Sequence, residues 1–131
     1  MSKGELAVLL DCDNSKMSME MPTLLSRRDV AVIAVSNDIN KLPKALGKAI
    51  GEVVDAYDNS ADFRMIAQLA AALESRPISD VIIVTQDRPF ARAVQEFSNL
   101  RRVNCEHYQN IYHALYNDRL LQALLYDPLN W

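Results

Sequence analysis

The sequence predicts one α/β domain spanning residues 1–131, with a mostly parallel sheet between two layers of helices. Short, unbroken apolar runs, typical of strands buried on both faces, alternate along the chain with segments of helical spacing. A length of 131 residues suits a single domain with one sizeable core. Half of the residues are hydrophobic and only three are glycine, as expected for an ordered globular protein.

Two apolar runs near the start predict the first strands. LAVLL at 6–10 is unbroken and ends at Asp11, and VAVIAV at 30–35 repeats the pattern. Between them, residues 18–28 place several apolar side chains on one helical face. The chain therefore begins as strand, helix, strand.

The middle of the chain is expected to continue this alternation. Asn40 is in position to cap a short helix over 42–51, and 52–57 is a weaker strand candidate. From Ser60, apolar residues recur at helical spacing until the chain approaches Pro77. This spacing predicts a longer helix.

The last part contains another doubly buried strand, VIIV at 81–84, which leads to Asp87. A helix is expected over 89–97, with its proline in the first turn. Residues 102–107 form a candidate final strand, and 109–126 have helical apolar spacing.

Charge and cysteine content exclude few functions. The formal net charge is −3, from 14 basic and 17 acidic residues, so any binding of nucleic acid has to come from a local patch. The apolar run at the start is too short to span a membrane and lacks the pattern of a signal peptide, so we expect a cytoplasmic protein. Cys12 and Cys105 lack metal-type spacing and are expected to be reduced, structural thiols. For His107 and His113 we expect surface or packing roles.

Acidic residues stand where predicted strands end. Asp11 and Asp87 each follow an apolar run, Asp13 is close behind the first, and Asp62 falls in the first turn of a predicted helix. Carboxyl ends of parallel strands share one edge of a sheet, so these side chains are expected to converge there. Carboxylates that lie within several Å of one another repel by about 1 to 4 kcal/mol per pair.

A hard divalent cation such as Mg²⁺ or Mn²⁺ offsets this repulsion, activates water and neutralises a phosphodiester. Simpler interpretations stay open at the same positions. Asp62 also suits a residue that complements the helix dipole, and Asp11 and Asp87 also suit turn-forming carboxylates.

Three segments resemble the motifs of one family. LLDCDN at 9–14 is similar to the first-strand signature of NYN domains, which are PIN-like nucleases, and DVIIVTQDRPF at 80–90 is similar to their later S-G-D-x-D-F motif. NSADFRM at 59–65 resembles the family's segment in which an aspartate opens a helix. The resemblance covers about residues 6–103, and the three segments follow the order found in the family.

The resemblance implies a Mg²⁺ or Mn²⁺ site formed by Asp11, Asp62 and Asp87, with Asp13 and Asn14 in or beside the coordination sphere. It also implies cleavage of nucleic acid, RNA more than DNA. The chain departs from the family pattern at three positions: Pro89 stands where the family has its second aspartate, and Gln86 and Cys12 replace glycines.

Six basic residues are candidates for contacts with substrate phosphates. Lys41, Lys44 and Lys48 would form one stripe on the predicted helix, where a solvated face is the alternative. Each of the other three follows a proposed site carboxylate; they are Arg64, Arg88 and Arg92. Arg88 is the preferred candidate, and an ion pair with Asp87 or another site acid is its alternative.

The C-terminal region is rich in tyrosine and leucine. Tyr108, Tyr112 and Tyr116 have a period of four, which suits packing or, as an alternative, stacking on bases. The leucines over 120–125 and Trp131 form an apolar segment that either closes the core or joins a second subunit in a homodimer.

The preferred hypothesis is a metal-dependent nuclease, with Asp11 and Asp87 as principal ligands, Asp13 and Asp62 in support and Arg88 at phosphate. One alternative is a catalytically inactive PIN-like module that binds nucleic acid or protein. A further alternative takes LLDCDN as the D-x-D motif of haloacid-dehalogenase-like phosphatases, in which the first aspartate attacks phosphate. That alternative leaves Asp87 without a role. It also requires a downstream lysine followed by paired acidic residues, and the sequence has no convincing match to this motif.

Overall fold

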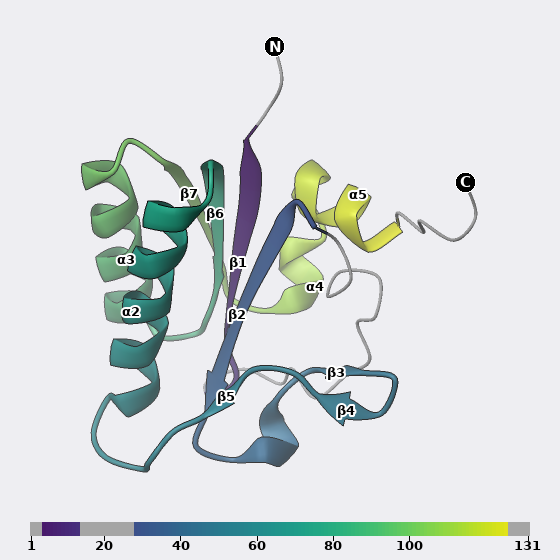
Figure 1. Ribbon diagram of the computed structural model, residues 1–131, viewed down its shortest axis with the longest axis vertical. Helices are drawn as coiled ribbons and strands as arrows, with labels where there is room; N and C mark the ends of the chain where they lie inside the picture. Colours follow the sequence, from purple (N-terminus) through teal and green to yellow (C-terminus); the bar gives the residue numbers. More distant parts are fainter. Residues whose placement is uncertain (1–3, 14–27, 126–131) are drawn as a thin grey trace.

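Five parallel strands form the central sheet, in the order β5-β2-β1-β6-β7 (Figure 1). The computed structural model describes residues 4–13 and 28–125. The strands of this sheet are β1 (Glu5–Asp11), β2 (Val30–Ser36), β5 (Glu52–Val53), β6 (Ile78–Val84) and β7 (Asn104–Tyr108).

The central position of β1 explains its unbroken apolar sequence. It pairs with β2 from Leu6↔Val30 to Asp11↔Val35, and with β6 on its other side. Alternate residues of β1 enter two different cores, so every side chain from Leu6 to Asp11 is buried. The chain leaves β1 toward β2 and later returns to β6 on the opposite side. The strand order therefore reverses between the ends of β1 and β6, where ligands bind in such sheets.

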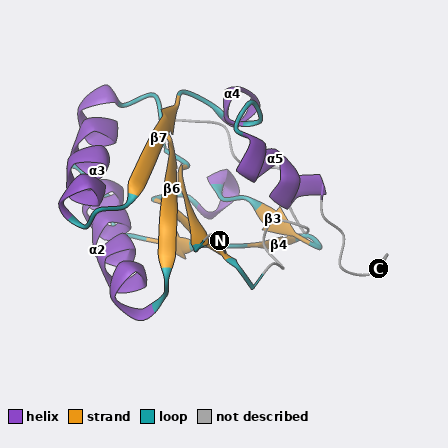
Figure 2. Cartoon of the chain, turned by 90° about the horizontal axis from the view of Figure 1, so that it is seen from above, coloured by secondary structure: helices purple, strands orange, loops and turns teal. Residues whose placement is uncertain are grey.

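Helices cover one face of the sheet, and a mixed layer covers the other (Figure 2). On the first face lie α2 (Ser60–Ser75) and α3 (Arg88–Leu100), which bury Met65, Leu69, Phe90 and Val94. On the second lie α4 (Ile111–Ala114), α5 (Asp118–Leu125) and a hairpin of β3 (Lys44–Ala45) and β4 (Lys48–Ala49). This arrangement confirms the predicted α/β class, a mostly parallel sheet within three layers.

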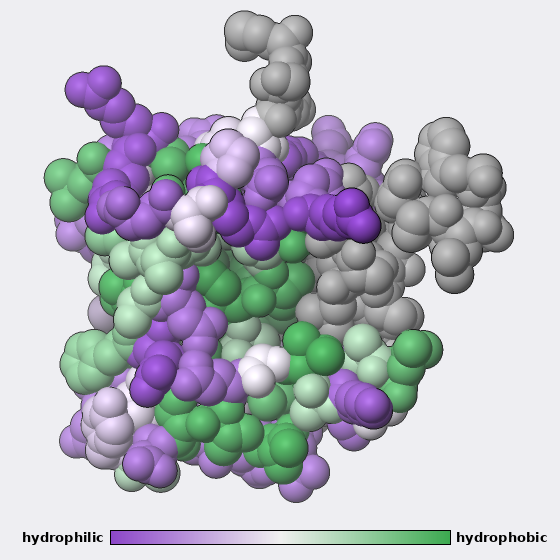
Figure 3. Space-filling view, viewed as in Figure 1, coloured by the Kyte–Doolittle hydropathy of each residue, from purple (hydrophilic) through white to green (hydrophobic). Residues whose placement is uncertain are grey.

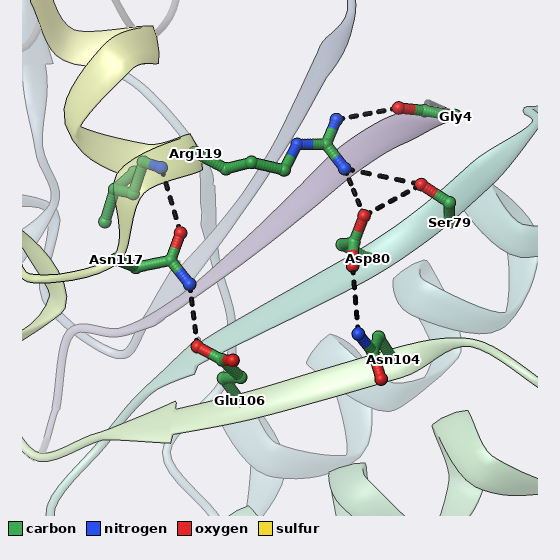
Figure 4. A network of polar contacts seen from close by, with 8 residues as sticks. Gly4, Ser79, Asp80, Asn104, Glu106, Asn117 and Arg119 are labelled. Carbon is green, nitrogen blue, oxygen red and sulfur yellow. Dashed lines mark hydrogen bonds and ion pairs between the residues drawn. The ribbon is translucent and has the colours of Figure 1, made fainter. Parts of the chain in front are cut away.

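Polar contacts fix α5 to the end of the sheet where β1 begins (Figure 4). Arg119 donates to Asp80 and Ser79 on β6, and also to the carbonyl oxygen of Gly4 at 2.7 Å. Asn104 on β7 donates to Asp80 at 3.3 Å. These contacts join four segments that lie far apart in the sequence.

Most predicted elements are confirmed. The runs at 6–10, 30–35 and 81–84 are strands, and the segments from Ser60 and over 89–97 are helices. The final strand begins two residues later than predicted, at Asn104, and the weak candidate over 52–57 is a strand only at Glu52–Val53.

The helix predicted over 42–51 is wrong. A short 3-10 helix, η1 (Ile39–Lys41), and the β3–β4 hairpin occupy this region. Leu46 and Gly47 have φ angles of 53° and 80°, values that a right-handed helix does not allow. Ile50 N donates to Pro43 O at 2.8 Å, which extends the hairpin. Lys41, Lys44 and Lys48 therefore do not form a helical stripe.

The single helical segment predicted over 109–126 is also wrong, because a turn divides it into α4 and α5. The Asn117 side chain accepts a hydrogen bond from Leu120 N at 3.1 Å, as an N-terminal cap does. Tyr108 belongs to β7, while Tyr112 and Tyr116 are exposed on α4 and in the turn, so the predicted tyrosine stripe is absent.

Leu120 is completely buried and closes the core, as one alternative for the C-terminal segment predicts. The side chains of Leu124, Leu125 and Trp131 lie outside the described residues, and the homodimer stays a prediction. The predicted helix over 18–28 falls, apart from Arg28, outside them as well. Among the described residues, no helix is both long and apolar enough to cross a membrane.

Candidate functional site

The ends of β1 and β6 bring Asp11 and Asp87 to the same edge of the sheet. Leu10 pairs with Val84, so the residues that follow each strand emerge side by side. Thr85 Oγ1 donates to Asp11 Oδ2 at 2.5 Å and accepts from the Asp87 backbone N–H at 3.0 Å. One buried hydroxyl thus fixes the positions of both acidic residues.

Ser36 does the same for Asp13 at the end of β2. Its hydroxyl donates to Asp13 Oδ1 at 2.5 Å and accepts from the Asp38 backbone N–H at 3.0 Å. The Asn37 N–H donates to the same Asp13 oxygen at 3.2 Å. The carboxylate of Asp13 is therefore held against the end of the neighbouring strand.

These contacts come from a four-residue pattern that occurs twice, VSND at 35–38 and VTQD at 84–87. In each copy the hydroxyl bonds the backbone of the final aspartate, whose side chain caps the next helix. Asp87 Oδ1 accepts from Phe90 N at 3.0 Å, and Asp38 Oδ1 accepts from Asn40 N at 2.9 Å. Sequence reasoning did not assign Ser36 or Thr85 to the carboxylate site, although the repeated pattern at two strand ends was a signal for them.

Asp62 joins the same group from the first turn of α2. Asn37 holds the start of this helix, since its amide donates to Ser60 Oγ at 3.0 Å and to Val54 O at 3.2 Å. Burial, followed by the negative charges of Asp11, Asp87 and Asp13, raises the pKa of Asp62 to about 6. The four aspartates, Asp11, Asp13, Asp62 and Asp87, therefore act as one electrostatic unit, which we call the carboxylate cluster.

The chemistry of the carboxylate cluster fits a hard divalent cation. Asp11 is completely buried and the other three are partly buried. Asp13, Asp62 and Asp87 form no ion pair with a described lysine or arginine. Carboxylate oxygens are the ligands that Mg²⁺ and Mn²⁺ prefer.

The cluster is not yet arranged as a set of metal ligands. Within residues 4–13 and 28–125, no three His, Cys, Asp or Glu side chains are placed to hold one ion. The carboxylates are near enough to shift a pKa, which requires less proximity than ligation does. Binding of an ion would therefore draw them closer together.

The candidate arginines divide into two groups. Arg64 pairs with Glu52 at 3.0 Å and Arg92 with Glu96 at 3.2 Å, so both guanidinium groups are engaged in ion pairs with glutamates outside the cluster. Arg88 begins α3 directly after Asp87, is exposed and forms no ion pair with any described residue. Arg88 is therefore the arginine best placed to bind a phosphate near the cluster.

The structure gives no ligand role to the remaining motif residues that it describes. Pro89 is exposed in the first turn of α3 and offers no ligand atom, and Asn14 lies outside the described residues. Burial, and then the charges of Asp11 and Asp13, raises the pKa of the Cys12 thiol to about 12, so it stays protonated. His107 Nε2 bonds Thr85 O at 2.8 Å, which suits packing at the strand end.

A cavity of about 440 Å³ lies elsewhere, against β6, β7 and the start of α5. Its lining includes Asp80, Glu106, Tyr108 and Arg119, and none of the carboxylate cluster. Burial alone would raise the pKa of Asp80, but hydrogen bonds from Ser79, Asn104 and Arg119 and the charge of Arg119 outweigh burial and lower it. Asp80 is thus already satisfied by its neighbours, and the strand ends are the better candidate for the functional site.

The strand order, the reversal point and the carboxylate cluster define this candidate site from the chain's own residues. In comparisons with known proteins, no family model, no curated protein and no solved structure matches the chain.

Proposed function

We propose that the protein is a divalent-metal-dependent nuclease that hydrolyses phosphodiester bonds at the carboxylate cluster. The observation that carries this proposal is the meeting of β1, β6 and α2 at the point where strand order reverses. There a single threonine hydroxyl holds Asp11 and Asp87 together. The motif resemblance to NYN domains supports RNA as the substrate rather than DNA.

Asp11 and Asp87 would be the principal ligands of Mg²⁺ or Mn²⁺, with Asp13 and Asp62 in support. Such an ion, when bound, supplies an activated water and neutralises charge on the phosphodiester. Thr85 and Ser36 hold the carboxylates in place through their hydroxyl groups. Arg88 binds a substrate phosphate through its planar guanidinium. We also propose a cytoplasmic location, which the free thiols of Cys12 and Cys105 fit.

A nucleic-acid-binding module without turnover is the second candidate. Two observations favour it: Pro89 stands where the family has a second aspartate, and no three acidic side chains in the described part are yet placed as ligands. The haloacid-dehalogenase-like alternative gains no support, because it gives no role to Asp87, which the Thr85 hydroxyl holds beside Asp11.

The test is cleavage of an end-labelled single-stranded RNA by the full chain with Mn²⁺, with Mg²⁺ and with EDTA. Asp87→Asn is the informative variant, because asparagine caps a helix as well as aspartate does and α3 stays capped while the charge is lost. Glu96→Gln, an exposed neutralisation on the same helix, is the matched control.

The nuclease predicts cleavage that requires metal, survives Glu96→Gln and is lost in Asp87→Asn and in Asp11→Asn. Cleavage that is equal in all four proteins, or that persists in EDTA, would contradict it. RNA binding without cleavage by any of them would favour the second candidate.

A further inference from the structure

The β3–β4 hairpin ends in a leucine that its turn does not explain. Pairing of Ala45 with Lys48 leaves Leu46 and Gly47 as a two-residue loop, and both have positive φ angles. A turn of this kind, type I′, favours asparagine followed by glycine, and leucine is disfavoured at a φ of 53°. The Leu46 side chain is 87% exposed, so packing does not explain its presence either.

The base of the hairpin is firmly attached to the protein. Leu42 is 1% exposed and belongs to the core cluster that includes Leu10 of β1, and Ala49 packs against the same cluster. Pro43 is buried and its carbonyl accepts from Ile50 N. The hairpin is therefore a short arm with a fixed base and an exposed apolar tip.

Cationic side chains flank this tip. Lys44 pairs with Ala49 and Ala45 with Lys48, so Lys44 and Lys48 belong to opposite faces of the hairpin. Neither lysine, nor Lys41 just before the hairpin, forms an ion pair with a described residue. Figure 3 shows hydrophobic and hydrophilic surface side by side over this hairpin.

The arm lies near the end of the molecule that carries the carboxylate cluster. In Figure 1 the hairpin is at the end of the sheet toward which the β1 and β2 arrows point. It follows closely on Ser36, the residue that holds Asp13. A chain with a net charge of −3 and an acidic strand edge needs such a local basic patch to bind a polyanion.

We propose that the β3–β4 hairpin is a nucleic-acid-binding arm, in which Leu46 inserts between neighbouring bases and Lys44 and Lys48 contact the flanking phosphates. Apolar side chains inserted between base steps, with lysines on the backbone, are an established means of holding nucleic acid. The proposal rests on the proposed function for the identity of the polyanion, and does not require that the chain cleaves it. An anionic lipid surface is less well suited, because one leucine buries little area in a bilayer.

Binding is measured in EDTA, so that cleavage plays no part. The probe is a fluorescein-labelled single-stranded RNA of 20 nucleotides, followed by anisotropy at several salt concentrations. Leu46→Asn is the main variant, because asparagine suits the turn and the arm stays folded while its apolar tip is lost. Leu100→Asn is the matched control, since Leu100 is 81% exposed at the far end of α3.

If the hairpin is a nucleic-acid-binding arm, Leu46→Asn should weaken RNA binding by roughly fivefold or more, and Leu100→Asn should leave it unchanged. Lys44→Gln/Lys48→Gln should lower the slope of log Kd against log salt by about 1.4, the value for two phosphate contacts with a single strand. Arg28→Gln/Arg102→Gln, which removes two exposed charges near the opposite end of the sheet, should leave the slope unchanged.

A second probe reports insertion directly. RNA with one central 2-aminopurine should become brighter on saturation with the wild-type chain, because an inserted leucine separates the fluorescent base from its neighbours. The same RNA should stay dim with saturating Leu46→Asn.

Three results would each overturn the proposed role of the hairpin. They are equal RNA binding by wild type and Leu46→Asn, no RNA binding by the wild type at 50 mM salt, and hairpin-dependent binding of phosphatidylserine vesicles in place of RNA. The two proposals fail differently. Cleavage that the hairpin variants leave unchanged contradicts the arm alone, whereas hairpin-dependent binding without cleavage contradicts the nuclease alone.

Discussion

At the scale of single residues, the sequence predicted the acidic side chains of the cluster, whereas the hydrogen-bond partners of Asp11 and Asp13 became clear only in the structure. Asp11, Asp13 and Asp87 follow apolar runs, and strands of a parallel sheet end at one edge, so their convergence followed from the sequence. Thr85 and Ser36 stand in a repeated sequence pattern, but the pattern alone does not show that their hydroxyl groups bond Asp11 and Asp13. Which side chain such a hydroxyl reaches depends on strand order, and sequence spacing does not give strand order.

The raised pKa of Asp62 predicts an unusual dependence of stability on pH. The pKa of Asp62 is about 6 in the folded protein, whereas the ordinary pKa of an aspartate, which applies to the unfolded chain, is 3.8. Between these values the folded state binds more protons, so the stability contributed by this group falls as pH rises from about 4 to about 6. In EDTA, Asp62→Asn should therefore be more stable than wild type at pH 7, and the two should converge near pH 4.

Urea denaturation at pH 4, 5, 6 and 7 measures this difference, with exposed Asp58→Asn as the control. Saturating Mn²⁺ should reverse the order at pH 7, because an ion stabilises the charged form of the cluster. The opposite result is that, in EDTA, the wild type becomes more stable relative to Asp62→Asn as pH rises from 4 to 7. It would show that the other carboxylates do not raise the pKa of Asp62.

At the scale of elements, predictions succeeded where packing and periodicity agreed. Strand β1 and helix α2 have long apolar patterns that match their burial. The segment over 42–51 has good helix formers but also contains Pro43 and Gly47. It forms the β3–β4 hairpin, and only the base of this hairpin enters the core. Burial of Leu42 with the hairpin decided the outcome there, and residue propensity is a weak guide over so few residues.

The turn of the β3–β4 hairpin carries a further prediction. Leu46→Asn should raise the free energy of unfolding by up to about 1 kcal/mol, because asparagine tolerates the left-handed backbone that leucine resists. Chemical denaturation checks this value. A loss of stability would mean that the Leu46 side chain packs within the chain, which would also remove the basis for its role at the tip of an arm.

At the scale of the whole molecule, the class of the fold was predictable and the order of its strands was not. Alternating strands and helices specify a parallel sheet, but several orders satisfy that pattern. The observed order places β1 in the middle and its end beside that of β6. The structure also shows the contacts by which Arg119 joins α5 to Asp80 of β6 and to Gly4 just before β1. No local sequence pattern indicated these contacts.

Arg119→Gln should destabilise the protein by about 1 to 2 kcal/mol at pH 7, because Asp80 loses a charged hydrogen-bond donor in a partly buried site. The pKa of Asp80 is lowered in the folded state, so the stability it contributes is present above its unfolded value of 3.8 and is lost as pH falls. The difference between wild type and variant should therefore shrink below about pH 4. Thermal unfolding at pH 3 and pH 7 checks both statements, and an equal difference at the two pH values would contradict the role of Asp80.

Titration of the full chain with Mn²⁺, with the free ion counted by electron paramagnetic resonance, measures whether the carboxylate cluster binds a divalent cation. We expect one Mn²⁺ site in wild type and in Glu96→Gln, and binding weakened by roughly tenfold or more in Asp87→Asn and in Asp62→Asn. Equal Mn²⁺ affinity in all four proteins, or no binding by the folded wild-type chain, would contradict this expectation.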